Sequence, residues 1–384
     1  MKYILQVFTG FWHTPCIPAG DIIEKIGGIA AGTEIDQVII GWSMEPSVYR
    51  KIGAFLHDNG IGMLLWLPVF SEVSKEARPD PAQDVFGKTL EALHTQEGDV
   101  FQFVCPSSGH NVQIVKDTYD KAFSDCGFDG VFLDRVRTQS FAAGVSGVLS
   151  CACDRCRKAF RGKSVDIAEV RKLYEDRKDS FFDVASWPMN GELMFENPLT
   201  QRFFEAKEEI IADTVAGVIR YFKDKGMVVG LDLFAPVISR FVGQRYSLMT
   251  KQADFIKPML YRRTDAPAGI GYEYTLFEKC APNARGKIKL FPDQAFLHTQ
   301  LQAIRQFPCD IYPGIEINYD KELVKTDVGY IRESLASIAE FGFKGAVLCW
   351  NIMEAPEAHI DAAVLTNPKT RRIIKLNDTL SGNG

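Results

Sequence analysis

Short apolar runs alternate along the chain with longer stretches whose apolar positions recur at helical spacing. The short runs are rich in β-branched and aromatic residues, as strands are when helices cover both faces of a parallel sheet. Eight such runs span residues 3–8, 38–42, 63–67, 130–133, 228–233, 255–260, 311–317 and 346–350. Helical periodicity covers residues 21–30, 46–59, 112–126, 198–225 and 327–341. The pattern therefore predicts a series of β/α units.

Eight β/α units favour a closed barrel over an open doubly wound sheet. The chain has 384 residues, which suits a single (β/α)8 TIM barrel with an insertion after strand four. No G-x-G-x-x-G follows the first strand, so we expect no dinucleotide and no other organic cofactor. We expect residues 1–365 to form the barrel and residues 366–384 to form a polar tail.

Two segments fall outside the count of eight. The apolar run at residues 101–105 would make a ninth strand, and we assign it to the long connection after the third strand. Residues 138–197 follow the fourth strand, and we interpret them as an insertion in the barrel. Loops after barrel strands build active sites, so this insertion is expected to border the functional site.

Composition and charge narrow the classes of function. The chain is 46% hydrophobic with a net charge of −5, and Lys and Arg form no basic stripe, so nucleic acid is not an expected partner. No stretch is long enough to span a bilayer, and the N-terminal run is too short for a signal peptide. The nine cysteines are an odd number and suit a reducing compartment. We expect a cytoplasmic protein, and the sequence leaves its oligomeric state open.

Carboxylates lie where the predicted strands end, and these ends share one mouth in a barrel. Asp134 follows the fourth strand, Asp232 lies in the fifth and Glu316 in the seventh. A carboxylate after an apolar strand is costly unless a partner or a function requires it. Asp134 therefore either serves chemistry or forms a salt bridge with Arg135 or Arg137. For Asp232 a hydrogen-bonding role in the core is equally open.

Aromatic residues also gather at the strand ends. Four of the five tryptophans lie there or in the adjoining loop. Flat aromatic faces stack on the C–H faces of sugars, which favours a carbohydrate cleft, although tryptophan at a strand end also packs in cores. The candidate substrate-binding residues are Trp12, His13, Trp42, Trp66, Arg135, Arg137, Lys257, Tyr261, Trp350 and Asn351.

Two carboxyls on opposite sides of a bond are what glycoside hydrolysis needs. The leading hypothesis is a glycosidase acting on an oligosaccharide, with Asp134 as nucleophile or general base and Glu316 as general acid. Asp232 is the alternative partner of Asp134. A second hypothesis is a carbohydrate-binding barrel without catalysis. A third is a Schiff-base lyase that uses Lys257, unless that lysine only pairs with an aspartate.

A C-x-C-x-x-C motif is formed by Cys151, Cys153 and Cys156. Three neighbouring thiolates repel one another unless a metal ion neutralises them, and Cys105 offers a fourth ligand for a closed structural site. The alternative is three free thiols at the surface.

Several motifs resemble those of known barrels. The fourth-strand sequence GFDGVFLDRVR, residues 127–137, resembles that of the glycosyl hydrolase-like TIM-barrel family. The loop CACDRCRKAF, residues 151–160, is similar to the Cys-rich loop of family 42 β-galactosidases, which binds structural zinc with an earlier cysteine placed much as Cys105 is here. KPMLY at residues 257–261 and GAVLCW at residues 345–350 are similar to late strands of such hydrolases and, more distantly, of chitinase-like barrels. The resemblance implies a glycoside hydrolase with structural zinc.

The chain also departs from these families. Asp134-Arg135 stands where family 42 enzymes carry Asn-Glu, and the chitinase signature D-x-x-D-x-D-x-E is absent. Asp134 occupies the position at which α-amylase-like and α-galactosidase-like barrels keep their nucleophile. The resemblance therefore leaves the acid and base assignment open.

Overall fold

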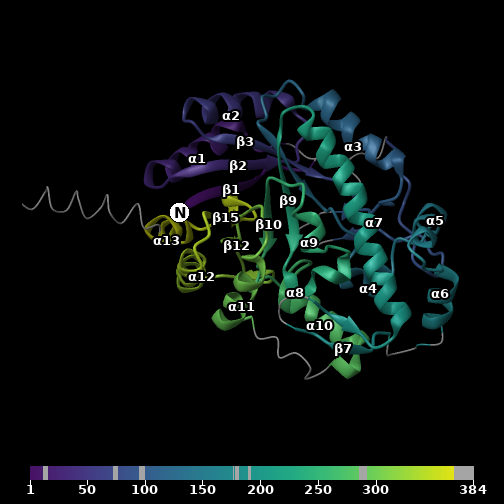
Figure 1. Ribbon diagram of the computed structural model, residues 1–384. Helices are drawn as coiled ribbons and strands as arrows, with labels where there is room; N and C mark the ends of the chain where they lie inside the picture. Colours follow the sequence, from purple (N-terminus) through teal and green to yellow (C-terminus); the bar gives the residue numbers. More distant parts are fainter. Residues whose placement is uncertain are drawn as a thin grey trace, which may run out of the picture.

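The barrel consists of eight parallel strands in a closed ring (Figure 1). The computed structural model describes residues 1–11, 16–71, 77–94, 100–175, 177, 181–188, 192–284 and 292–366. Around the ring the strands are β1 (Lys2–Phe8), β2 (Ile35–Gly41), β3 (Gly62–Pro68), β6 (Gly130–Asp134), β9 (Val228–Phe234), β10 (Phe255–Met259), β12 (Gly314–Glu316) and β15 (Gly345–Cys349). β15 pairs with β1 and closes the ring, which confirms the predicted TIM barrel.

Every apolar run assigned to the barrel in the sequence overlaps one of these strands. β6 and β15 are buried along their whole length, as expected for strands covered on both faces. The run at residues 311–317 is divided into β11 (Asp310–Ile311) and β12. Pro313 lies between them, and proline cannot donate the backbone hydrogen bond that a continuous strand needs.

Helices form the outer layer of the barrel (Figure 1). The longest is α7, which is capped by Asn197: its side chain accepts hydrogen bonds from the amides of Leu199 and Thr200, and Pro198 occupies the first turn. The described helices are α1 (Ala19–Gly32), α2 (Pro46–Asp58), α3 (Gly109–Ala122), α4 (Gly144–Val148), α5 (Asp154–Gly162), α6 (Ile167–Glu175), α7 (Pro198–Lys223), α8 (Pro236–Ser239), α9 (Tyr246–Met249), α10 (Ile270–Cys280), α11 (Gln294–Ile304), α12 (Val328–Glu340) and α13 (Glu357–Thr366).

Aromatic rings fill the barrel interior beneath the strand ends. Phe132 on β6 and Phe255 on β10 stack with ring centroids 6.0 Å apart. Gly230 on β9 makes room for this stack, because a Cβ at that position would lie 2.1 Å from the Phe255 ring. The interior is therefore closed below, and polar groups at the strand ends lie above an apolar floor.

The extra apolar run lies outside the barrel, as predicted. Its first residue belongs to the hairpin of β4 (Leu93–His94) and β5 (Val100–Phe101), within the connection from β3 to α3. Phe103 and Val104 form single bridges with Ser71 and Pro81 in the same connection.

The insertion after β6 contains α4, α5, α6 and a small hairpin of β7 (Val184–Ser186) and β8 (Met194–Phe195). In Figure 1, α5 and α6 lie on the side of α7 that faces away from the barrel strands. Phe160 of α5 stacks on Phe203 of α7 with centroids 5.1 Å apart, and Tyr174 of α6 hydrogen-bonds Thr200. The insertion is thus packed against the barrel's longest helix. Residues 367–384 of the predicted tail lie outside the described residues.

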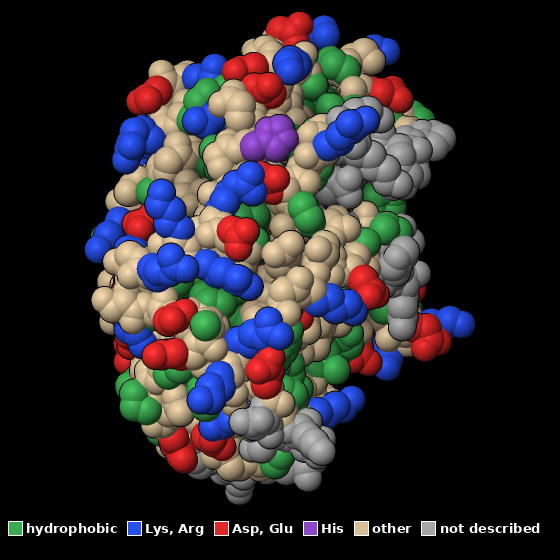
Figure 2. Space-filling view, turned by 90° about the vertical axis from the view of Figure 1, so that its right-hand side faces the viewer, with side chains coloured by type: hydrophobic (Ala, Val, Ile, Leu, Met, Phe, Trp, Pro, Cys, Tyr) green, Lys and Arg blue, Asp and Glu red, His purple; other side chains and the backbone are tan. Residues whose placement is uncertain are grey.

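The surface carries mixed charge. Figure 2 shows one face on which basic and acidic side chains are interspersed, without a stripe of either sign. None of the helices in the described ranges is long and apolar enough to cross a membrane.

Candidate functional site

A cavity of about 170 Å³ opens at the C-terminal ends of the barrel strands. This volume suits one small polar group, such as a single sugar residue, because the pockets that hold drug-sized ligands measure roughly 300–1,000 Å³. The described residues that line it are Gln6, Trp42, Trp66, Asp134, Arg135, Arg137, Asp232, Met259, Tyr261, Thr264, Ala266, Pro267, Ala268 and Trp350.

Asp134 ends β6, and hydrogen bonds hold both of its carboxylate oxygens. Trp66 Nε1 donates to Oδ2 over 3.0 Å, and the backbone amide of Arg135 donates to Oδ1 over 2.5 Å. Arg135 has a φ of +52°, in the left-handed region that few residues with a side chain adopt. No described residue forms an ion pair with Asp134. Its carboxylate oxygens bind Trp66 and a backbone amide, and the alternative of a salt bridge to Arg135 or Arg137 is not observed.

Asp232 lies beside Asp134 on the neighbouring strand. Leu133 pairs with Leu231 in register, so the two aspartates that follow are adjacent, with backbones about 4.8 Å apart. Burial raises the pKa of Asp232 to about 7; the charge of Asp134 adds to this rise, and Lys257 and Arg137 oppose it. Oδ2 accepts a hydrogen bond from Lys257, whereas Oδ1 has no partner among the described residues.

Lys257 is fully buried beneath the cavity and donates three hydrogen bonds. Its Nζ lies 2.9 Å from Asp232 Oδ2, and the other acceptors, each at 3.0 Å, are Gln6 Oε1 and Tyr261 Oη. Burial acts to lower the pKa of Lys257, but Asp232 and other acidic neighbours outweigh it, and the pKa is raised. A Schiff base needs a neutral amine that reaches the substrate. The geometry therefore does not support the lyase hypothesis.

The two arginines line the cavity and rest on aromatic rings. The guanidinium of Arg135 lies 4.5 Å from the ring centroid of Trp42, and its Nη1 donates to Ser71 Oγ over 3.0 Å. The guanidinium of Arg137 lies over the ring of Phe234, 4.5 Å from its centroid. Stacking of this kind fixes a cation in place without using its hydrogen-bond donors.

Aromatic side chains form part of the cavity wall. Trp42 and Trp66 pack against each other with ring centroids 5.0 Å apart, and Tyr261 packs against Trp350 at 5.9 Å. All four line the cavity, so the structure brings them together as the sequence suggested. Of the other aromatic candidates, Trp12 and His13 lie outside the described residues.

Glu316 and Asn351 do not line the cavity. Glu316 is completely buried; its Oε1 accepts from the backbone amide of Arg263 over 2.6 Å, and its Oε2 from Tyr330 Oη over 2.7 Å. Burial raises the pKa of Glu316, against the effect of these hydrogen bonds. Asn351 Oδ1 accepts from the amide of Phe8 over 3.1 Å. The general-acid assignment of Glu316 therefore loses its geometric support, and Asp232 is the better-placed partner of Asp134.

Some residues of the site were not predicted from the sequence. Gln6 lines the cavity and binds Lys257, and its signal was a single amide within the apolar first strand. Thr264 and residues 266–268 come from the loop after β10, which has no pattern that marks it. Glu316 accepts hydrogen bonds from Arg263 and Thr264, so its role in the fold includes holding this loop.

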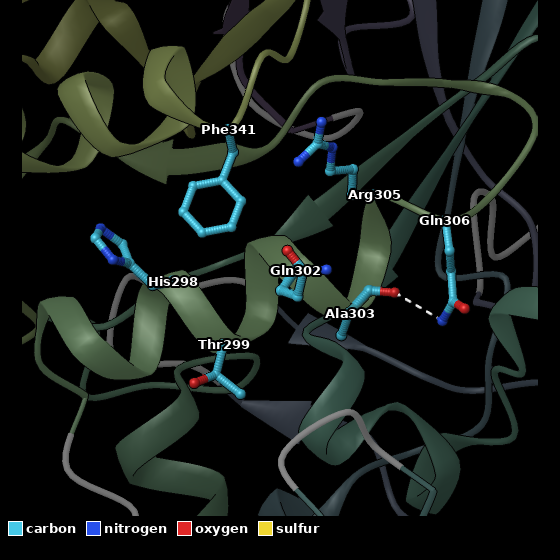
Figure 3. A pocket seen from close by; sticks show the side chains of 7 residues that line it. All are labelled: His298, Thr299, Gln302, Ala303, Arg305, Gln306 and Phe341. Atoms are coloured by element: carbon cyan, nitrogen blue, oxygen red, sulfur yellow. Dashed lines mark hydrogen bonds between the residues drawn. The ribbon is translucent and has the colours of Figure 1, made fainter.

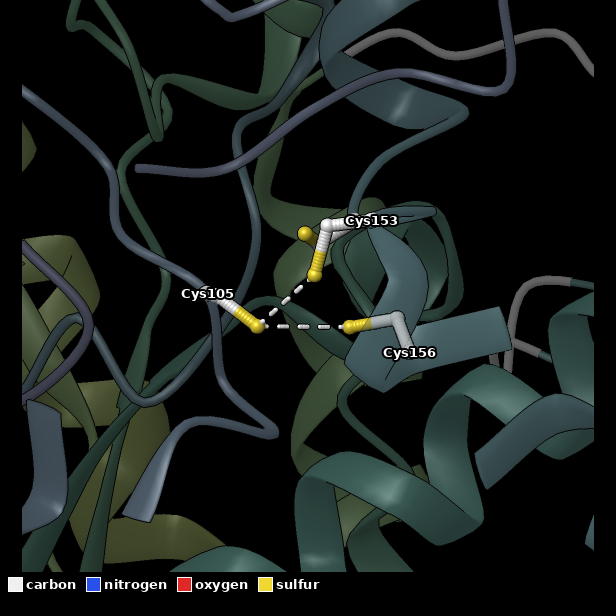
Figure 4. A group of neighbouring side chains, drawn as sticks. Cys105, Cys153 and Cys156 are labelled. Carbon is white, nitrogen blue, oxygen red and sulfur yellow. Dashed lines mark hydrogen bonds between the residues drawn. The ribbon is translucent and has the colours of Figure 1, made fainter. Parts of the chain in front are cut away.

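The four cysteines of the predicted metal site come together. Figure 4 shows three of them, Cys105, Cys153 and Cys156, with their sulfur atoms turned toward one another. All four sulfur atoms lie within 4.8 Å of one another, and the distances from Cys105 to Cys153 and Cys156 are 3.3 and 3.5 Å. Tetrahedral thiolate ligands around a zinc ion lie roughly 3.8 Å apart, so the cluster fits a metal ion. The exposed fractions run from 0% for Cys105 to 8% for Cys153, which overturns the alternative of free thiols at the surface.

A second hollow, of about 810 Å³, lies on the outer side of the barrel (Figure 3). Its described lining comes from α11, the two residues after that helix, and Phe341, which follows α12. None of its described lining residues is a carboxylate, and it lies away from the strand ends, so these residues offer no acid and base pair. Its lining residues are His298, Thr299, Gln302, Ala303, Arg305, Gln306 and Phe341.

Comparison with known proteins supports the fold. No protein-family model and no curated protein matches the sequence. The glycoside hydrolase domain of PgaB (BpsB) from Bordetella bronchiseptica has a TM-score of 0.57 and 14% identity, with 97% of each chain covered. The catalytic domain of β-amylase from Paenibacillus polymyxa has a TM-score of 0.55 and 9% identity, over 95% of this chain and 97% of that one. The chain thus shares its fold with TIM-barrel glycoside hydrolases.

Another match is α-L-fucosidase isoenzyme 2 from Paenibacillus thiaminolyticus, with a TM-score of 0.57 and 10% identity. The matched region covers 95% of this chain and 48% of the fucosidase. At these identities the likeness concerns the fold.

The buried ion pair of Lys257 and Asp232 should contribute to stability because each charge offsets the cost of burying the other. Lys257→Met leaves the Asp232 carboxyl without its cation and should lower the free energy of unfolding by about 3–5 kcal/mol. The double variant Lys257→Met/Asp232→Asn should lose less than the sum of the two single changes. Urea denaturation of the wild type, the two single variants and the double variant measures this coupling. Lys163→Met is the matched surface control, and this change should lower the free energy of unfolding by about 1 kcal/mol or less. Additivity within about 0.5 kcal/mol would contradict the coupling.

Proposed function

We propose that this protein is a glycoside hydrolase and that Asp134 and Asp232 are its two catalytic carboxyls. The observation that carries the proposal is that these two aspartates, on neighbouring strands, line one small cavity with an aromatic and basic wall. The fold shared with the PgaB glycoside hydrolase domain and with β-amylase agrees with it. A binding barrel without catalysis would not need two adjacent carboxyls in such different surroundings.

In this proposal Asp134 is the nucleophile or general base. Its two oxygens accept hydrogen bonds from Trp66 and from the amide of Arg135, and these bonds fix the orientation of the carboxyl group. Two carboxyls of a retaining glycosidase are about 5–5.5 Å apart, whereas an inverting enzyme needs a wider gap for water. The adjacent strand positions therefore favour retention, with Asp134 as nucleophile.

Asp232 is the general acid. Its pKa of about 7 keeps a substantial fraction of the carboxyl protonated at neutral pH, and Oδ1 has no hydrogen-bond partner among the described residues, so its proton is not committed to another group of the protein. Lys257 holds Oδ2 and fixes the orientation of the carboxyl. Trp42, Trp66 and Trp350 would stack on the sugar.

Hydrolysis of a panel of nitrophenyl α- and β-glycosides tests the central assignment. Asp134→Asn should lower kcat by at least about 1,000-fold, because an amide can act neither as nucleophile nor as base. Asp129→Asn is the matched control just before the opposite end of the same strand, where the carboxylate accepts a hydrogen bond from the Met63 amide. The control should retain its rate within about 2-fold, as ordinary surface changes do. Equal rates for Asp134→Asn and the wild type, with both folded, would refute the assignment.

The pH dependence of kcat/KM tests the role of Asp232. A general acid must be protonated, so activity should fall as the pH rises through about 7. Lys257→Met removes a charge that lowers the pKa of Asp232, and the basic limb of the profile should move to higher pH. A basic limb that is absent, or one that Lys257→Met leaves in place, would contradict the proposed acid.

We also propose that the ion held by Cys105, Cys151, Cys153 and Cys156 is zinc and that its role is structural. Four thiolates leave no open coordination position for substrate or water, which is typical of structural zinc. When bound, the ion would neutralise the thiolates and tie Cys105 in the β3–α3 connection to the insertion after β6.

Metal analysis and thermal melting test this site. Protein purified under reducing conditions with zinc supplied should contain one zinc ion per chain, and Cys153→Ser should lose the ion and melt several degrees lower. Cys309→Ser is the control, since Cys309 lies outside the cluster. Zinc-free protein whose melting temperature does not respond to a chelator or to added zinc would refute the site.

A further inference from the structure

Arg137 is a buried cation whose hydrogen-bond donors are mostly unused. Its exposed fraction is 7%, and its one hydrogen bond to a described residue runs from Nη1 to Thr138 O over 3.0 Å. Nε is buried and has no acceptor among the described residues. A buried guanidinium without acceptors is unfavourable. The arrangement is therefore suited to a ligand that supplies oxygen atoms to this edge.

Aromatic rings determine which part of Arg137 a ligand can reach. Its guanidinium carbon lies 4.9 Å from the ring centroid of Phe103 and 4.5 Å from that of Phe234. Contacts of this kind occupy the face of a guanidinium and leave its edge for hydrogen bonds. That edge presents paired N–H groups whose spacing matches the two oxygens of a carboxylate.

The rest of the cavity is consistent with an anionic ligand. Arg135 lines it as a second guanidinium, and Lys257 adds positive charge from below. Burial raises the pKa of Asp232 to about 7, so this carboxyl carries less than its full charge at neutral pH. Glu273 also acts on Arg137 electrostatically, but it binds the amide of Ala268 and does not line the cavity.

We propose that the sugar bound in this cavity carries a carboxylate and that Arg137, with Arg135 beside it, binds that group. The substrate class is therefore the glycosides of uronic acids. This inference rests on the proposed glycoside hydrolase function and adds the chemical nature of its substrate. The paired N–H groups of a guanidinium edge bind the two oxygens of a carboxylate in a bidentate arrangement.

Matched substrates test the proposal directly. The wild type should hydrolyse nitrophenyl glucuronides or galacturonides with a kcat/KM at least about 10-fold above that for the corresponding glucosides or galactosides, both anomers being compared. Arg137→Gln should lower kcat/KM on the uronide by about 10- to 150-fold more than on the neutral glycoside, with the extra loss appearing mainly in KM. Arg137→Lys, which keeps the charge and loses the paired donors, should fall between the two.

Arg240→Gln is the control for loss of a buried arginine outside the cavity, since Arg240 has an exposed fraction of 6%. It should leave the ratio of uronide to neutral rates unchanged. Equal or faster hydrolysis of the neutral glycoside by the wild type would overturn the proposal, as would an equal loss on both substrates in Arg137→Gln. The wild-type comparison decides the matter if Arg137 variants do not fold. Preference for a sulfated sugar over the uronide would overturn the carboxylate assignment.

Binding without turnover separates this proposal from the proposed function. In calorimetry, the Asp134→Asn variant should bind glucuronate or galacturonate more tightly than glucose or galactose. Adding Arg137→Gln to this variant should abolish the difference in affinity. If no glycoside is hydrolysed and uronates still bind more tightly in a way that depends on Arg137, the proposal of an acidic ligand is supported and the hydrolase function is refuted. If neutral glycosides are hydrolysed and uronates do not bind better, the hydrolase stands and the acidic ligand fails.

Discussion

The closed ring of parallel strands is the constraint on which the rest of the molecule depends. Because β15 pairs with β1, the carboxyl ends of all eight strands meet at one mouth. The ring is narrow, and the stacked Phe132 and Phe255 close it below, in space that Gly230 leaves free. Polar groups inside such a ring need partners, and Asp232 and Lys257 provide them for each other. The cavity is therefore shallow and lies at the strand ends.

Two adjacent carboxyls in this cavity have different surroundings. Asp134 ends its strand and accepts hydrogen bonds on both oxygens, whereas Asp232 lies within its strand, where burial raises its pKa and a lysine holds one oxygen. Environments that separate the proton affinities of two acids are how acid and base roles are divided in enzymes. The different partners of the two carboxyls, which lie opposite each other on neighbouring strands, thus produce the asymmetry that the proposed chemistry requires.

The cysteine cluster and the cavity are joined by a short stretch of chain. Cys105 is two residues from Phe103, whose ring packs on the guanidinium of Arg137. Phe103 also bridges to Ser71, which accepts a hydrogen bond from Arg135. An ion that ties Cys105 to the insertion would therefore hold the segment that contacts Arg137 directly and Arg135 through Ser71, although the ion would lie outside the cavity.

The sequence by itself determined the eight strands, the barrel, the placement of the 101–105 run outside it and the candidate cysteines. Each depends on local periodicity or spacing, which a linear chain displays directly. The tertiary structure decided which strand-end residues share a cavity. Glu316 ends its strand as Asp134 does, yet it is turned to the loop after β10, while Gln6 and that loop enter the wall. Such facing depends on strand register and on loops from distant parts of the chain, and no local pattern encodes either.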